Sequence, residues 1–193
     1  MKKILLATRN KDKFRIISKL LKTDNFKDYD YLCLDDINDE IIDKKEEGDV
    51  INRSYQKALN VYSNLKNNSY DFIIGIDDGI MMKGKMIENI KNYIKSIIDN
   101  EYLEENEKIF IVRAYTFFDK NGKYKSIVTE IPFKYIPLKE KFEIKENSYP
   151  LSRVMAPLNG NKAVFALNED ETNQYYLNYS KSAFDEVENY FND

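Results

Sequence analysis

Short apolar runs alternate with stretches of helical periodicity along the first half of this chain, and that alternation most constrains the fold. The runs at Lys3–Ala7, Tyr29–Leu34 and Phe72–Ile76 have the length and composition of buried strands. Between and after them, apolar residues recur at spacings of three and four, which is typical of amphipathic helices. We therefore predict helices from Lys11 onward, over Val50–Leu65 and over Ile87–Ile97.

The second half begins with a long β-hairpin. Ile109–Phe118 and Lys123–Ile136 flank an Asp-Lys-Asn-Gly segment, and the Asn-Gly pair is a strong hairpin signal. Alternating strands and helices around a hairpin predict an α/β domain with a mixed sheet flanked by helices. For the last third we expect a loop containing Pro150 and Pro157, a short strand at Ala163–Leu167, and helices at Glu169–Tyr176 and Ser180–Tyr190.

Composition then limits the chemistry. The 193 residues contain no His, which excludes His-based triads, proton relays and imidazole metal sites. Cys33 is the only cysteine, so neither a disulfide framework nor a multi-thiolate metal site forms within one chain. Carboxylate, lysine and arginine chemistry is left. The length predicts one domain over residues 1–193, built of two lobes.

The net charge and the hydropathy of the sequence predict which partners the protein binds and where it is located. Thirty basic and 33 acidic residues give a net charge of −3, so we expect no coating of DNA or RNA duplexes, although a local phosphate pocket remains open. The apolar run at the start is too short for a signal peptide, and no window approaches the roughly 20 apolar residues of a membrane span. We expect a soluble cytoplasmic protein.

The loop after the first predicted strand is a candidate anion site. Thr8, Asn10 and Lys13 lie between a buried strand and the start of a helix. Backbone N–H groups at a helix N-terminus can hold phosphate, and ligands of α/β sheets collect at the carboxyl ends of strands. The alternative is a capped helix with solvated lysines.

Four carboxylates are candidate metal ligands. Asp77 and Asp78 follow an apolar strand and could hold Mg²⁺ or orient a hydrolytic water. The alternative is an Asp-Asp-Gly turn. Glu46 and Glu47 would add oxygen ligands if the fold brings them near Asp77, and otherwise form an exposed acidic loop.

Lys57 lies beside the apolar face of its predicted helix, so its ammonium could point into a site lined by the first loop. Alternatively, the side chain extends to water along the helix surface. The 11 Phe and 15 Tyr residues could stack on a base, but most of them must form the core.

In this order, the segments resemble the inosine/xanthosine triphosphate pyrophosphatases, which remove non-canonical purine nucleotides. The opening Thr-x-Asn-x-x-Lys of that family matches Thr8–Lys13, and its Leu-Asp-Asp matches Leu34–Asp36. Its Glu-x-Gly and Lys-Ala match Glu46–Gly48 and Lys57–Ala58. Its Asp-Ser-Gly-Leu resembles Asp77–Ile80, so the matches cover about the first 80 residues in family order.

The resemblance implies Mg²⁺-dependent hydrolysis of a nucleoside triphosphate to a monophosphate and pyrophosphate. It also implies an elongated sheet, a cleft between two lobes and a homodimer. Thr8, Asn10 and Lys13 would bind the phosphates, and Lys57 would neutralise them. Asp77 would align or deprotonate the attacking water and hold the metal with Glu46 as a second ligand. Such chemistry needs positioning and charge neutralisation more than a covalent nucleophile.

The chain departs from the family pattern in the base pocket and in part of the metal site. The family's Ser-His-Arg, which recognises the base, is replaced by Asn178–Ser180, just before Lys181. The segment 148–153, Ser-Tyr-Pro-Leu-Ser-Arg, stands where Gly-Tyr-Asp-Pro is usual, which makes Arg153 and nearby tyrosines alternative base contacts. Asn52-Arg53 replaces Glu-Asn before Lys57, and Ile76 replaces the carboxylate that precedes Asp77.

Two hypotheses follow. In the first, the protein is a divergent nucleotide pyrophosphatase with an altered base pocket. In the second, it is a non-catalytic homologue that binds a nucleotide or a protein partner, because a fold does not by itself determine a function.

Overall fold

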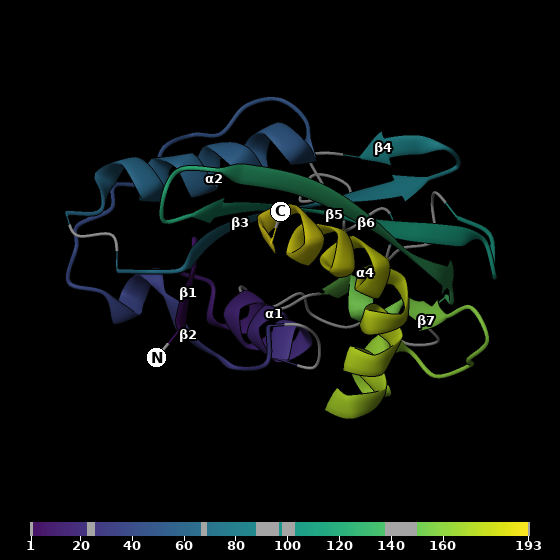
Figure 1. Ribbon diagram of the computed structural model, residues 1–193. Coiled ribbons are helices and arrows are strands. Elements are labelled where there is room, and N and C mark those ends of the chain that lie inside the picture. The colour runs from purple at the N-terminus through teal and green to yellow at the C-terminus, as the bar shows by residue number, and fades with distance from the viewer. Residues whose placement is uncertain are drawn as a thin grey trace.

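The computed structural model describes residues 2–22, 26–66, 69–87, 97, 103–137 and 150–192, which form a mixed β-sheet with helices on both faces (Figure 1). The sheet order is β2-β1-β3-β5-β6-β7, with β4 pairing beside β3. The strands are β1 (Lys2–Leu6), β2 (Tyr29–Cys33), β3 (Phe72–Met82), β4 (Lys85–Ile87), β5 (Lys108–Asp119), β6 (Tyr124–Tyr135) and β7 (Met155–Pro157).

Helix α2 covers one face of the sheet, and α1 and α4 lie on the other (Figure 1). The N-terminal part of the sheet is parallel, with β1 pairing to both β2 and β3, whereas β3, β5, β6 and β7 run antiparallel in turn. The helices are α1 (Lys11–Lys22), α2 (Val50–Asn64) and α4 (Glu169–Asn192), with 3-10 turns η1 (Leu34–Asp36), η2 (Pro150–Arg153) and η3 (Val164–Ala166).

The central strand β3 explains how the two layers are held. Its side chains alternate between the faces, as the two-residue period of a strand requires. Ile73 packs in the core beneath α2, while Ile74 and Ile76 pack in the core shared with α1 and α4. Between them Gly75 lets α2 approach closely, because a Cβ there would lie 2.0 Å from the Ser54 carbonyl oxygen.

A buried chain of hydroxyls links α2 to the hairpin. Ser54 Oγ lies 2.8 Å from Thr116 Oγ1 on β5, and Thr116 Oγ1 lies 2.8 Å from Ser126 Oγ on β6. Ser54 and Thr116 are fully buried, so these contacts satisfy polar groups that would otherwise be costly inside the protein. They fix the position of α2 over β3 and β5.

The α/β class with a mixed sheet and flanking helices is confirmed, and so is the long hairpin. Three local predictions were wrong. The predicted turn at Asp77–Gly79 is part of the continuous strand β3, because its backbone pairs with β5 throughout. The predicted strand at Ala163–Leu167 is the 3-10 turn η3, and the two predicted C-terminal helices are the single helix α4.

Part of the predicted helix Ile87–Ile97 can be assessed. Ile87 ends strand β4 instead of beginning a helix, and residue 97 is helical and buried, whereas residues 88–96 lie outside the described part of the chain. The proline-punctuated loop was predicted without β7, whose three residues pair with β6.

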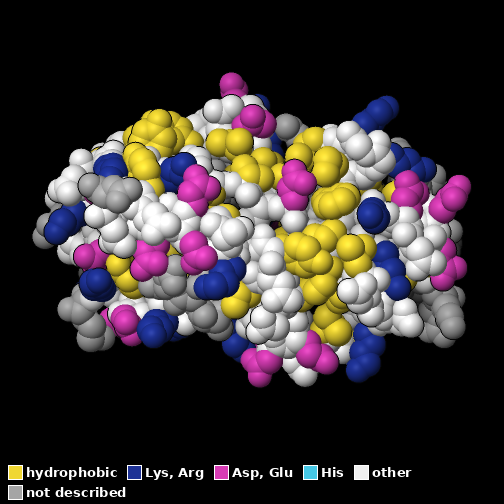
Figure 2. All heavy atoms as spheres, turned by 45° about the vertical axis from the view of Figure 1, so that its right-hand side comes forward, with side chains coloured by type: hydrophobic (Ala, Val, Ile, Leu, Met, Phe, Trp, Pro, Cys, Tyr) yellow, Lys and Arg dark blue, Asp and Glu magenta, His cyan; other side chains and the backbone are white. Residues whose placement is uncertain are grey.

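On the face shown in Figure 2, acidic and basic side chains are interspersed and do not form a continuous basic stripe. This distribution agrees with the near-zero net charge of the sequence. Among the described helices, none combines the length and the apolar character that a membrane crossing requires.

Candidate active site

The candidate site lies on β3, at the carboxyl end of β1. Strand β1 pairs with β3 as far as Ile74, and β4 pairs with it from Ile80 onward. Asp77 and Asp78 lie in the interval between, close to the loop that follows β1. This is the edge of an α/β sheet at which ligands usually bind.

The two aspartates point to opposite faces of the sheet. Successive side chains of a strand alternate, so Asp77 faces α2 whereas Asp78 faces α1 and α4. Each carboxylate therefore has its own set of cations. This arrangement corrects the expectation of two adjacent carboxylates that act together on one ion.

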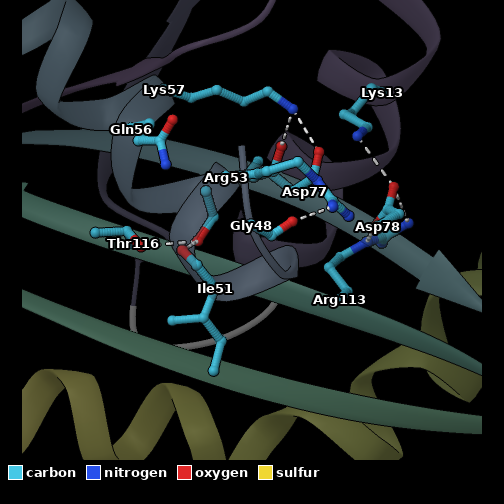
Figure 3. A network of polar contacts seen from close by, with 12 residues as sticks. Lys13, Gly48, Ile51, Arg53, Gln56, Lys57, Asp77, Asp78, Arg113 and Thr116 are labelled. Carbon is cyan, nitrogen blue, oxygen red and sulfur yellow. Dashed lines mark hydrogen bonds and ion pairs between the residues drawn. The ribbon is translucent and has the colours of Figure 1, made fainter. Parts of the chain in front are cut away.

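On the α2 face, Asp77 is bound by two cations of that helix (Figure 3). Lys57 Nζ lies 2.5 Å from Asp77 Oδ1 and Arg53 Nε lies 2.7 Å from Asp77 Oδ2. Arg53 and Lys57 are four residues apart, which places them on one face of the helix. Arg53 Nη1 also donates to the Gly48 carbonyl oxygen at 2.6 Å, which ties the loop before α2 to the site.

On the opposite face, Asp78 is bound by Arg113 and Lys13 (Figure 3). Arg113 lies directly across from it on β5, with Nε 2.5 Å from Oδ1, and Lys13 Nζ of α1 lies 3.0 Å from Oδ2. Burial alone would raise the pKa of Asp78, but the charges of Arg113 and Lys13 outweigh it and hold that pKa far below its ordinary value. Burial would likewise lower the pKa of Arg113, which the charge of Asp78 instead raises.

The loop after β1 is ordered by its own polar side chains. Thr8 Oγ1 accepts the Asn10 N–H at 3.1 Å, and Asn10 Oδ1 accepts the Lys13 N–H at 2.9 Å at the start of α1. Asn10 therefore caps the helix, as the alternative interpretation of this loop expected. Both groups accept in these bonds, and each also carries donor hydrogens suited to an anion.

A cavity of about 290 Å³, here called the α2 cavity, opens on one side of this loop. It brings together Thr8, Glu46 and Lys57, three of the residues singled out in the sequence. Glu47 does not line this cavity, and its backbone exchanges hydrogen bonds with the Gln56 side chain. Glu46, and not Glu47, is therefore the acidic residue of the segment that borders the cavity.

A larger cavity of about 510 Å³, here called the α4 cavity, opens on the other side of the loop. Asn10, Lys13 and Asp78 line its polar end. The wall towards α4 and η3 includes Tyr176 and the 54% exposed Phe165, which offers an aromatic surface. The cavity thus joins a charged end to an aromatic end.

Two buried donors in the wall of the α4 cavity lack partners within the described part of the chain. They are Arg113 Nη1 and Asn173 Nδ2, on side chains that are only 6% and 7% exposed. An unsatisfied buried donor costs about 1–3 kcal/mol, so such groups usually have a functional reason. Both side chains line the α4 cavity, although the two nitrogen atoms themselves are almost completely buried.

Residues at or beside the positions that depart from the family's base-recognition motifs lie in different parts of the structure. The Arg153 guanidinium lies over the ring of Phe165 at 4.8 Å. Phe165 lines the α4 cavity, whereas Arg153 itself does not. Lys181 lies along α4 and pairs with Asp185 at 3.7 Å. Ser148 and Tyr149 of the replaced motif lie outside the described residues.

The acidic residues present do not fit a protein-bound Mg²⁺. Among the described residues, no group of three acidic, His or Cys side chains could hold a metal ion. Both oxygens of Asp77 are engaged by Arg53 and Lys57, and both oxygens of Asp78 by Arg113 and Lys13. Mg²⁺ needs free oxygen ligands in octahedral geometry, and the oxygens of these carboxylates already accept hydrogen bonds from lysine and arginine side chains.

Sequence reasoning missed two members of the cluster, Arg53 and Arg113. Arg53 was noted only as a departure from a family pattern, although its spacing from Lys57 already placed both cations on one helix face. Arg113 is the one charged residue between the two ends of a largely apolar strand, and a buried charge requires a partner. That requirement was the available signal.

Comparisons with known proteins agree on the fold. No family model and no curated protein matches the sequence. Among solved structures, a HAM1 protein from Coxiella burnetii is similar with a TM-score of 0.65 and 12% identity, covering 97% of this chain and 98% of that one. A nucleoside-triphosphatase (dITP/XTP pyrophosphatase) from Mycobacterium abscessus is similar with a TM-score of 0.58 and 13% identity. This likeness covers 94% of this chain and 96% of that one.

A third similar structure, the Ham1 protein of Staphylococcus aureus, gives a TM-score of 0.53 and 15% identity over 97% of this chain and 100% of that one. All three likenesses extend over nearly the whole of both chains, well beyond the motifs in the first 80 residues. The chain therefore has the Ham1 and dITP/XTP pyrophosphatase fold that its sequence motifs predicted.

Proposed function

We propose that this protein is a nucleoside-triphosphate pyrophosphohydrolase that releases pyrophosphate from a nucleotide bound across the loop after β1. One observation carries the proposal. Two aspartates and four cations meet between two cavities, at the ligand-binding edge of a fold shared with a dITP/XTP pyrophosphatase. The cluster has a formal charge of +2, which suits a polyanion.

The two cavities divide the nucleotide between them. The phosphates would lie along the loop, where Thr8 and Asn10 offer donors and where Lys13 and Lys57 approach from the two helices. The base would enter the α4 cavity and stack on Phe165. This cavity would be the altered base pocket, and the unpaired Asn173 amide in its wall would favour a base that presents acceptor atoms, as the deaminated purines do.

Hydrolysis needs a water held in line with the bond to be broken. Water attacks the α-phosphorus, its oxygen forms the new P–O bond, and the bond to the bridging oxygen breaks so that pyrophosphate leaves. Asp77 would orient this water and take its proton, while Lys57 shifts from the carboxylate towards the phosphate. No step is assigned to Mg²⁺ on Asp77 and Glu46, because the residues present do not fit that ion.

The same ion pairs favour a second candidate, nucleotide binding without turnover. Both oxygens of Asp77 accept from cations, and a carboxylate so engaged is a weak base for water. A chain that kept only the binding half of the site would show this arrangement too. The homodimer and the single domain over residues 1–193 stay predictions under either candidate.

Identification of products separates the two candidates. The protein is incubated with a panel of standard and deaminated nucleoside triphosphates, with and without Mg²⁺, and pyrophosphate and monophosphate are quantified. We expect both products in equal amounts and their loss in Asp77→Asn. Binding measured by calorimetry without any product, in a protein shown to be folded, would leave only the second candidate.

A further inference from the structure

We infer that Arg53 and Lys57 take the place of a protein-held divalent ion, so that this site binds nucleotide phosphates without metal. The inference rests on the proposed nucleotide function and deepens it. It starts from a disagreement between the fold, whose resemblance to Mg²⁺-dependent enzymes implies an ion on Asp77, and the side chains, which put two cations there.

Geometry places the two cations where an ion on Asp77 would lie. Lys57 Nζ and Arg53 Nε each contact a different oxygen of the Asp77 carboxylate, at 2.5 and 2.7 Å. Lys57 Nζ also donates to the Ile76 carbonyl oxygen at 3.5 Å, so it contacts two oxygen atoms on β3. An incoming Mg²⁺ would have to displace both side chains and would meet their positive charge.

Charge leads to the same conclusion. Two unit charges on Arg53 and Lys57 equal that of one divalent ion, and Asp77 cancels half of it. Side chains of the pair are 16% and 23% exposed, so their charges act in a partly dry site where interaction with phosphate is stronger than in water. An arginine is always charged and carries five donors in a planar fork, which suits phosphate oxygens.

The fold holds these cations in place before a ligand arrives. Arg53 Nη1 donates a hydrogen bond to the Gly48 carbonyl oxygen at 2.6 Å, which holds the guanidinium in place. Gly48 has a left-handed backbone with φ of +89°. Lys57 borders the α2 cavity, so it can turn towards a phosphate with little movement of α2. Such a preorganised pair needs no ion to complete it.

The test is calorimetric titration of inorganic tripolyphosphate and of a nucleoside triphosphate, in excess EDTA and again in Mg²⁺. We expect binding of both in EDTA, with an affinity that Mg²⁺ does not raise. Binding that appears only with Mg²⁺ would overturn the inference and leave the proposed function intact. No binding in either condition would overturn both.

Variants distinguish a specific role of Arg53 in phosphate binding from the effect of removing one positive charge anywhere on the protein. Arg53→Gln should weaken binding in EDTA by about tenfold or more, the scale of a lost hydrogen bond to a charged group. Because it frees Asp77 Oδ2, we expect Mg²⁺ to restore part of that loss, and Arg53→Lys to keep binding in EDTA. Lys120→Gln, an equal loss of charge on the exposed β5–β6 turn, is the control. An effect of Arg53→Gln no larger than that of the control would contradict the inference.

Discussion

Neighbouring aspartates have separate roles here because a strand turns consecutive side chains to opposite faces. Asp77 faces α2 and is the residue proposed to act on water, whereas Asp78 faces α1 and is held by Arg113 and Lys13. The sequence singled out this pair as candidate site residues, because two adjacent carboxylates follow an apolar run. It could not assign their partners, because Arg53 and Arg113 come from other elements.

Asp78→Asn should destabilise the protein by about 3–5 kcal/mol at pH 7, the cost of breaking a buried ion pair. The pKa of Asp78 is lower in the folded state than in the unfolded state, so its contribution is complete above the unfolded value of about 3.9. It is lost as pH falls through the folded value, and the difference from the wild type should shrink below about pH 4. Urea unfolding between pH 3 and 7 measures this.

The control is Asp170→Asn on α4, whose side chain is 93% exposed. Its free energy of unfolding should stay within about 0.5 kcal/mol of the wild type, as is usual for surface substitutions. Equal losses in the two variants at every pH would show that the Asp78 ion pairs do not stabilise the fold.

Asn173→Leu tests whether the unpaired amide in the α4 cavity serves a ligand. Removing a buried donor that lacks a partner should leave the free energy of unfolding unchanged or raise it. If the amide donates to the base, nucleotide affinity should fall by about tenfold, while affinity for tripolyphosphate, which has no base, stays the same. Loss of stability with unchanged nucleotide affinity would give Asn173 a structural role instead.

At the scale of elements, periodicity predicted the strands and helices whose faces are clearly apolar or amphipathic, including β1, α1, α2 and the β5–β6 hairpin. It failed at β3, where Asp-Asp-Gly has the composition of a turn, because pairing with β5 overrides local preference. It also failed at α4, where two helices separated by residues 177–179 were predicted and a single helix packs against the sheet.

Gly75→Ala should strongly destabilise the packing of α2 on β3. The added Cβ would lie 2.0 Å from the Ser54 carbonyl oxygen and 2.7 Å from the Ala58 nitrogen. Both are backbone atoms of α2, so the clash can be relieved only by moving the helix away from the sheet. We expect a loss of about 3 kcal/mol or more in urea unfolding, at the upper end of overpacking costs.

Gly160→Ala is the matched control, because its nearest atoms to an added Cβ are 3.5 Å away. We expect that variant to be as stable as the wild type or slightly more stable. Similar stability of both variants would mean that α2 does not approach β3 as closely as described.

For the whole molecule, the candidate site depends on the convergence of five segments of the chain. The loop after β1 and helix α1 supply one part, α2 supplies Arg53 and Lys57, and β3 and β5 supply Asp77, Asp78 and Arg113. The order of motifs predicted the fold and the meeting of Thr8, Glu46 and Lys57 around a cavity. Which carboxylate meets which cation depends on register and could not be read from spacing.

The most direct test of the account is the stoichiometry and identity of the products formed from a nucleoside triphosphate in excess EDTA. Separation of nucleotides by chromatography, with pyrophosphate measured by phosphorus NMR, should give one monophosphate and one pyrophosphate per turnover. Asp77→Asn should abolish both products while the protein remains folded by circular dichroism. Formation of a nucleoside diphosphate and orthophosphate would contradict the proposed reaction. Product formation that is unchanged in Asp77→Asn would contradict the proposed role of Asp77.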